Sequence, residues 1–175
     1  NEFPSTIALF KDCLLGTALL LGDEIELVYI FHDGNSLYYY IGGRPVEDGT
    51  TETFQFKHLP SRLQDFYREV HDGYTFYPAR SMGPQRLADQ SRVSELVDEA
   101  DDSFAAGCIT VFSNGSGDYV AVNADSHDDS DGLIWWHENP ATPEFAIDVF
   151  RVMDAWMGVF LADTKPRAQL LGKPC

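Results

Sequence analysis

Apolar residues recur every three to four positions in four segments of the chain, and this period predicts four helices. Pro4-Ser5 opens the first segment, and Asp72-Gly73 is expected to end the second. The predicted helices are Ser5–Leu20, Pro60–Asp72, Arg86–Ala100 and Pro143–Ala162. In the last of them, the face expected to be buried carries Phe145, Val149, Val152, Met153, Trp156 and Phe160.

Short runs rich in β-branched and aromatic residues predict strands between these helices. His32-Asp33-Gly34-Asn35 separates the first two runs, and an Asp-Gly turn between such runs indicates a hairpin. Tyr74–Pro84 reads as an aromatic loop, and the chain after Asp163 as a loose tail. The predicted strands are Glu26–Phe31, Ser36–Ile41, Thr53–Lys57, Ala106–Phe112, Tyr119–Val122 and Leu133–Trp136. The pattern predicts one α+β domain over residues 1–175, with an antiparallel or mixed sheet flanked by helices.

Charge is distributed unevenly along this chain. It carries 28 acidic and 12 basic residues, a net charge of −16. Residues 93–150 contain 13 of the acids and neither Lys nor Arg. Such a region repels nucleic acid and anionic membranes and attracts basic surfaces. We therefore expect a protein partner with a basic surface, and neither nucleic acid nor membrane.

Motifs for catalysis, cofactors and targeting are not found. No apolar run approaches the roughly 20 residues of a membrane span, and no signal peptide is expected. The three cysteines lack metal-ligand spacing, which favours a reducing, cytoplasmic location. The glycine-rich segment 114–118 has no lysine and lies between strands, so it predicts a tight turn, and Cys108 is expected to be an inert buried thiol. The sequence predicts a non-enzyme without cofactor or metal.

One segment has the spacing of a calcium-binding loop. From His127 as position 1, carboxylates or glycine stand at positions 3, 5, 6 and 12, namely at Asp129, Asp131, Gly132 and Glu138. Histidine is a poor ligand for a hard cation, and the flanking segments read as strands where an EF-hand needs helices. Calcium-dependent binding remains a third hypothesis.

Several motifs, taken in order, resemble the SUKH superfamily. Leu59-Pro60 opens an amphipathic helix containing Phe66-Tyr67 and ending at Asp72-Gly73. The strand-turn-strand 112–123, the next strand Leu133–His137 and the closing helix Phe145–Phe160 match the family's order and spacing. The resemblance covers about residues 59–162. It leaves residues 1–55 as an N-terminal extension of helix and hairpin, and 163–175 as a tail.

The resemblance implies a function without catalysis. Members are mostly bacterial immunity proteins that bind and neutralise a cognate toxin domain, often a nuclease, and a eukaryotic branch regulates cell-wall assembly through protein contacts. An acidic inhibitor suits a toxin whose cleft is basic for the phosphate backbone. The alternative is a non-catalytic regulatory module without a toxin partner. Nothing in the sequence indicates the oligomeric state.

Partner contacts are expected on an acidic loop, the strand that follows it, an acidic segment near residue 98 and an aromatic loop. Trp135 and Trp136 point to opposite faces of a strand, so one is expected in the core while the other is a candidate anchor. Asp118 is expected to cap its turn. The candidates are Asp125, His127, Asp128, Asp129, Asp131, Trp135, Trp136, His137, Glu138, Glu95, Asp98, Glu99, Asp101, Asp102, Tyr74 and Tyr77.

Overall fold

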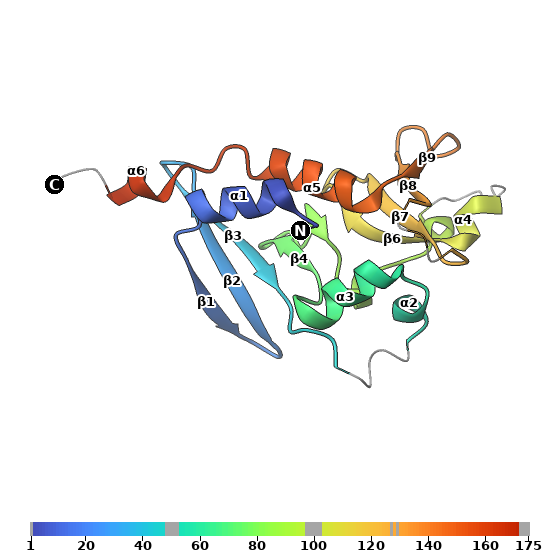
Figure 1. Ribbon diagram of the computed structural model, residues 1–175, viewed down its shortest axis with the longest axis horizontal. Coiled ribbons are helices and arrows are strands. Elements are labelled where there is room, and N and C mark those ends of the chain that lie inside the picture. The colour runs from blue at the N-terminus through green and yellow to red at the C-terminus, as the bar shows by residue number, and fades with distance from the viewer. Residues whose placement is uncertain (1, 48–52, 97–102, 127, 129, 172–175) are drawn as a thin grey trace.

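The computed structural model describes residues 2–47, 53–96, 103–126, 128 and 130–171, and it shows an α+β fold with two antiparallel sheets flanked by helices (Figure 1). The predicted fold class is therefore confirmed. Among the described residues, no helix has the length and apolar character required to cross a membrane.

The N-terminal part of the chain builds a four-stranded sheet in the order β1-β2-β3-β4. Its strands are β1 (Gly16–Leu21), β2 (Ile25–His32), β3 (Leu37–Gly42) and β4 (Tyr74–Phe76). The predicted hairpin is confirmed as β2 and β3. Its turn is closed by Asp33, whose Oδ1 accepts hydrogen bonds from the backbone N–H groups of Asn35 and Ser36, both at 2.6 Å. Gly34, which follows Asp33 in this turn, has φ +100°, which glycine adopts without a steric penalty.

The second half of the chain supplies most of a five-stranded sheet in the order β5-β6-β7-β8-β9. Its strands are β5 (Gly83–Pro84), β6 (Cys108–Ser113), β7 (Tyr119–Asn123), β8 (Gly132–Trp135) and β9 (Glu144–Ile147). The three strands predicted here are confirmed as β6, β7 and β8. Tyr74–Pro84 is more ordered than predicted, because it holds β4 and β5.

Helices cover both sheets. They are α1 (Pro4–Cys13), α2 (Phe54–Lys57), α3 (Ser61–Glu69), the 3₁₀ turns η2 (Leu87–Asp89) and η3 (Val93–Glu95), α4 (Ser103–Gly107), α5 (Val149–Phe160) and α6 (Arg167–Leu171). The helix predicted from Pro60 is confirmed as α3, with Leu63 and Tyr67 on its buried face. Gly73, with φ +74°, follows it.

The first predicted helix is too long. Helix α1 ends at Cys13, and the apolar residues that follow form β1. Leu14 is extended, and the Leu15 N–H donates to the Ile30 carbonyl at 2.8 Å, so pairing with β2 takes over from the helix. A run of leucines fits either structure, and the long-range partner decides between them.

The strand predicted at Thr53–Lys57 is wrong, because these residues form α2. The Thr53 hydroxyl caps this helix by accepting from the Phe56 N–H at 3.4 Å. The helix predicted at Arg86–Ala100 is also wrong over its described part, which holds only η2 and η3. There the Thr110 N–H donates to the Ser91 carbonyl at 2.9 Å, so the segment runs along β6 instead of coiling into a helix.

The last predicted helix begins six residues later than expected. Asp148 caps α5 by accepting from the Arg151 N–H at 3.0 Å, and the residues before it pair with β8 as β9. Phe145 therefore lies on an edge strand and is 58% exposed, which contradicts its predicted burial. The tail is not loose in its described part, because it holds α6 and Thr164 is buried.

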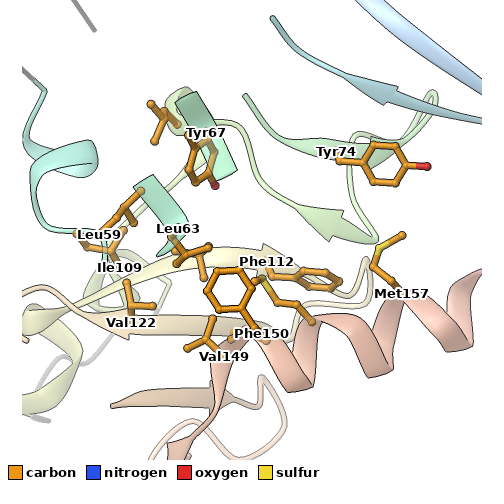
Figure 2. Packing of buried hydrophobic residues seen from close by; sticks show 14 of the residues in the cluster. Leu59, Leu63, Tyr67, Tyr74, Ile109, Phe112, Val122, Val149, Phe150 and Met157 are labelled. Carbon is orange, nitrogen blue, oxygen red and sulfur yellow. The ribbon is translucent and has the colours of Figure 1, made fainter. Parts of the chain in front are cut away.

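A shared apolar core lies between the two sheets (Figure 2). Phe31 and Tyr40 come from the four-stranded sheet, and Ile109, Phe112 and Val122 from the five-stranded one. Helices α3 and α5 close it with Leu63, Tyr67, Val149, Phe150, Met153 and Met157. The N-terminal helix and hairpin thus pack into the same core as the segment that carries the SUKH resemblance.

Helix α1 is attached to α5 by one buried carboxylate. Asp154 is 6% exposed and accepts three hydrogen bonds: from the backbone N–H groups of Ser5 (3.0 Å) and Thr6 (2.9 Å), and from the Thr6 hydroxyl (2.9 Å). These donors lie in the first turn of α1, whose N–H groups have no partner within the helix.

Candidate functional site

The five-stranded sheet has a second face, which carries a smaller apolar cluster. Cys108, Ala121, Leu133 and Trp135 point to this side, and η3 and α4 cover it through Val93 and Ala105. The cover is incomplete at one end, where β6 starts, β7 ends and β8 starts. A pocket of about 220 Å³ opens there.

Two carboxylates stand at this pocket, which we call the acidic pocket. Asp125 and Asp131 line it, and both are exposed. Asn123, at the end of β7, contacts both residues. Its amide donates to Asp131 Oδ2 (3.2 Å) and so orients that carboxylate, while its side-chain oxygen accepts from the Asp125 backbone N–H (3.0 Å). Neither carboxylate forms an ion pair with Lys or Arg within the described part of the chain.

The thiol of Cys108 lies at the same pocket. Burial, followed by the negative charges of Asp131 and Asp125, raises the pKa of Cys108 to about 11. The side chain is therefore a protonated thiol at neutral pH, and a thiol is a weak nucleophile. The negative charges of Asp125 and Asp131, unlike burial, favour a positive charge that enters the pocket.

Two aromatic rings complete the acidic pocket. Phe104 of α4 and Phe145 of β9 meet edge to face, with their centroids 5.5 Å apart and their planes at 88°. Because Phe145 is 58% exposed, the pair offers an apolar surface beside the two carboxylates. This combination fits the side chain of Arg or Lys, whose apolar stem packs on rings while its charged head stays near carboxylates.

The two neighbouring tryptophans point to opposite faces of the sheet, as the strand alternation predicts. Trp135 is 4% exposed and belongs to the smaller cluster, with Tyr119 beside it. Trp136 is half-buried on the other face against Trp156 of α5, and its indole N–H donates to Glu144 at 3.1 Å. Trp136 is thus the more accessible of the two.

Asp118 and His137 form a hydrogen-bonded pair on the glycine-rich turn. The Asp118 carboxylate accepts from the His137 backbone N–H at 3.0 Å and lies 2.7 Å from His137 Nδ1. Partial burial tends to raise the pKa of Asp118, but the hydrogen bonds from His137 and Asn114 outweigh it, and the pKa is lowered. The prediction that Asp118 caps its turn is confirmed, since it also pairs with the amide of Asn114 at 2.6 Å. His137 therefore lies at the glycine-rich turn and does not line the acidic pocket.

The remaining predicted residues are dispersed. Asp128 and Glu138 are exposed, and Asp128 accepts from the N–H and hydroxyl of Ser130, which lower its pKa. Glu95 is exposed on η3, which packs against α4. The candidates outside the described residues are Asp98, Glu99, Asp101, Asp102, His127 and Asp129.

Of the two tyrosines of the aromatic loop, Tyr74 lies in β4 of the four-stranded sheet, and Tyr77 directly follows that strand. Tyr74 is only 6% exposed in the core, so it is removed from the surface candidates. Tyr77 is 41% exposed, and its N–H donates to the Tyr39 carbonyl at 2.8 Å. Neither residue lines the acidic pocket.

The calcium hypothesis gains no ligand cluster from the described residues. Nowhere among them do three His, Cys, Asp or Glu side chains gather as metal ligands. His127 and Asp129, two members of the calcium spacing, lie outside the described residues. The strand β7 precedes this spacing and the strand β8 lies within it, where the sequence predicts strands and an EF-hand needs flanking helices.

Sequence reasoning missed both aromatic walls of the acidic pocket. The sequence pattern does not indicate Phe104, and it predicts Phe145 on the buried face of a helix. A signal was present, because Pro143 precedes the alternating run Glu144–Ile147, which suits an edge strand as well as a helix start.

Comparisons of the chain with protein-family models, curated proteins and solved structures find no match.

Proposed function

We propose that this chain is an immunity-type protein, which neutralises a cognate bacterial toxin domain by binding it without catalysis. The observation that carries the proposal is the acidic pocket, where two carboxylates adjoin two aromatic rings and have no basic partner among the residues that the structure describes. The pocket receives a basic side chain of the toxin. The SUKH resemblance of residues 59–162 supplies the class of function.

The distribution of charge supports a basic partner. Region 93–150 builds α4 and β6 to β9, which lie together at one end of the molecule, opposite the β1–β2 hairpin (Figure 1). Two bases of the N-terminal half, Arg80 and Arg86, are engaged on the four-stranded sheet. Arg80 forms a two-pronged pair with Glu26 at 2.7 and 2.9 Å, and Arg86 pairs with Glu24. The acidic end therefore attracts a basic surface, and this attraction speeds the association of the two proteins at low salt.

The proposal is tested with the toxin domain encoded next to this chain's gene. The domain is co-expressed with the chain, growth is scored, and the affinity of the purified pair is measured by calorimetry. Tight binding with rescue of growth is the expected result. Absence of both would favour the alternative, a regulatory interaction module without a toxin partner.

A pair of double variants tests the acidic pocket itself. Asp125→Asn/Asp131→Asn is expected to weaken the complex about 30-fold or more, or roughly 2 kcal/mol. The reason is that the basic side chain of the toxin, buried in the complex, loses the carboxylates that pair with it. Asp12→Asn/Asp23→Asn makes the same change in net charge at exposed positions that do not line the pocket, and is expected to cost threefold or less. Equal losses in both variants would remove the acidic pocket from the mechanism and leave only long-range attraction.

A further inference from the structure

A second, larger cavity lies where α1, α3 and α5 meet the four-stranded sheet. Its volume is about 440 Å³, within the range of about 300–1,000 Å³ that small-molecule sites occupy. Its apolar walls are formed by Phe3, Ile7, Phe10, Phe66, Phe150 and Met157. It shares no residue with the acidic pocket.

Three uncharged polar side chains line the inner wall: Thr6, Tyr29 and His71. The Thr6 hydroxyl donates its proton to Asp154, and the hydrogen bonds of the other two show which protons they carry. His71 is 7% exposed; its Nδ1 lies 2.8 Å from the Gly43 carbonyl oxygen, and its Nε2 lies 2.7 Å from the Tyr29 hydroxyl. A carbonyl oxygen only accepts, so Nδ1 carries a hydrogen. Burial lowers the pKa of His71, so the ring is neutral at pH 7 and Nε2 is an acceptor.

The Tyr29 hydroxyl therefore donates its only proton to His71. What remains on the Tyr29 oxygen is acceptor capacity. Burial also raises the pKa of Tyr29, so the phenol stays protonated at neutral pH. A ligand that reaches this oxygen has to bring an N–H or O–H donor.

Charged lining residues stand at the exposed rim of the cavity. Arg62 pairs with Glu2 and lies over the Phe150 ring, 4.3 Å from its centroid. Asp65 and Glu69 are exposed on α3, so the rim carries three acids and one base among the described residues. An anion is repelled by this rim. A cation is attracted to the rim, but the polar groups deeper inside, Thr6, Tyr29 and His71, are uncharged, so a cation there has no counter-charge beside it. Both charges would lose hydration without compensation.

We propose that this cavity binds a small, uncharged aromatic molecule that donates one hydrogen bond to the Tyr29 oxygen. The aromatic preference follows from the walls, where Phe10, Tyr29 and Tyr74 already pack edge to face or tilted, with centroids 5.2 to 5.7 Å apart. The site is independent of toxin neutralisation and stands on its own geometry.

Indole and benzofuran are matched probes for this site, because they share shape and size but only indole has an N–H donor. Each is titrated into ¹⁵N-labelled full chain, and chemical shifts report both location and affinity. Indole is expected to shift the amides around Tyr29 and His71 and to bind about fivefold more tightly than benzofuran, the effect of one hydrogen bond. Indole-3-carboxylate, an anion at pH 7, is expected to bind at least tenfold more weakly than indole.

Variants separate the hydrogen bond from the cavity. Tyr29→Phe is expected to remove the difference between the two probes while benzofuran binds as before. Val70 is 47% exposed and lines the cavity, so Val70→Trp narrows the cavity mouth. It is expected to weaken the binding of both probes. Val159→Trp is the matched control, since Val159 is 70% exposed on α5 and is not among the cavity-lining residues.

Three results would overturn the proposal. The first is no saturable shift near Tyr29 with either probe in the unmodified chain. The second is equal affinity for indole and benzofuran, and the third is a loss in Val159→Trp as large as in Val70→Trp. The first result needs no variant, so failure of a variant to fold leaves the test intact.

Discussion

The attachment of α1 to α5 through Asp154 predicts a large and pH-dependent loss of stability when this carboxylate is changed. Asp154→Ala removes the acceptor of three hydrogen bonds and leaves the N–H groups of Ser5 and Thr6 without a partner. A lost helix cap costs about 0.5–2 kcal/mol, and a hydrogen bond to a charged group contributes about 1.5–3 kcal/mol. Because these terms overlap, we expect a decrease of about 2–4 kcal/mol in the free energy of unfolding.

Asp154→Asn separates charge from geometry. The amide oxygen can still accept from Thr6, while the bond from Ser5 and the favourable charge at the start of α1 are lost. We expect a decrease of about 1–2 kcal/mol at pH 7. Asp163→Asn, at an exposed position just after α5, is the matched control and is expected to change stability by less than about 0.5 kcal/mol.

The effect of Asp154 depends on pH in a defined direction. Burial alone would raise the pKa of Asp154, but the hydrogen bonds from Thr6 and Ser5 prevail and hold it below the ordinary value of 3.8. A lowered folded-state pKa stabilises the protein above 3.8, and this stabilisation is lost as the pH falls through the folded-state value. The difference between the unmodified chain and Asp154→Asn should therefore be constant from pH 7 to about pH 5 and decline below pH 4.

Urea unfolding followed by tryptophan fluorescence measures these differences. The reasoning is refuted if Asp154→Ala destabilises the chain no more than the control Asp163→Asn does. It is also refuted if the deficit of Asp154→Asn is as large at pH 3 as at pH 7, because the carboxylate would then act through packing alone.

Other predictions concern packing, ion pairing, the acidic pocket and thiol reactivity. Gly132→Ala is expected to lower the free energy of unfolding by about 1–3 kcal/mol in urea, because a Cβ there would collide with the buried Val149 side chain. Glu26→Gln should destabilise by about 1–2 kcal/mol, since Glu26 is 6% exposed but its partner Arg80 is 38% exposed and partly screened by water; an unchanged urea midpoint would contradict this. Phe145→Ser should leave the melting temperature within about 2 °C while weakening toxin binding in calorimetry, and a large drop in melting temperature would show that Phe145 is a core residue after all. Cys108 should react with iodoacetamide at pH 8 only after unfolding, as judged by peptide mass spectrometry, because it is buried and its pKa is about 11.

Much of the five-stranded sheet could be predicted from local pattern. The strands β6, β7 and β8 are buried runs separated by turn residues, and Asn114 and Asp118 close the first turn through their own side chains. The helix α3 could also be predicted from local pattern, because the period of its apolar residues, the proline at its start and the glycine after its end all indicate the same helix. In each case the deciding interactions lie within about ten residues of one another.

The sequence predicted the two carboxylates of the acidic pocket but not its two aromatic rings. Asp125 and Asp131 stand out in the sequence because no base accompanies them for 58 residues. Phe104 and Phe145 stand 41 positions apart, and no periodicity connects them. Their contact depends on β9 pairing with β8 and on α4 lying across the same face.

The sequence by itself determined the α+β class, the short-range turns and the concentration of negative charge, since all three depend on composition or on neighbours along the chain. The tertiary structure alone decided whether 16–21 and 144–147 are strands or helices, because both segments suit either form until a partner strand offers its hydrogen bonds. It also decided which carboxylates meet aromatic rings and which histidine meets Tyr29. Such contacts join residues far apart in sequence, and only the packing of the core brings them within reach.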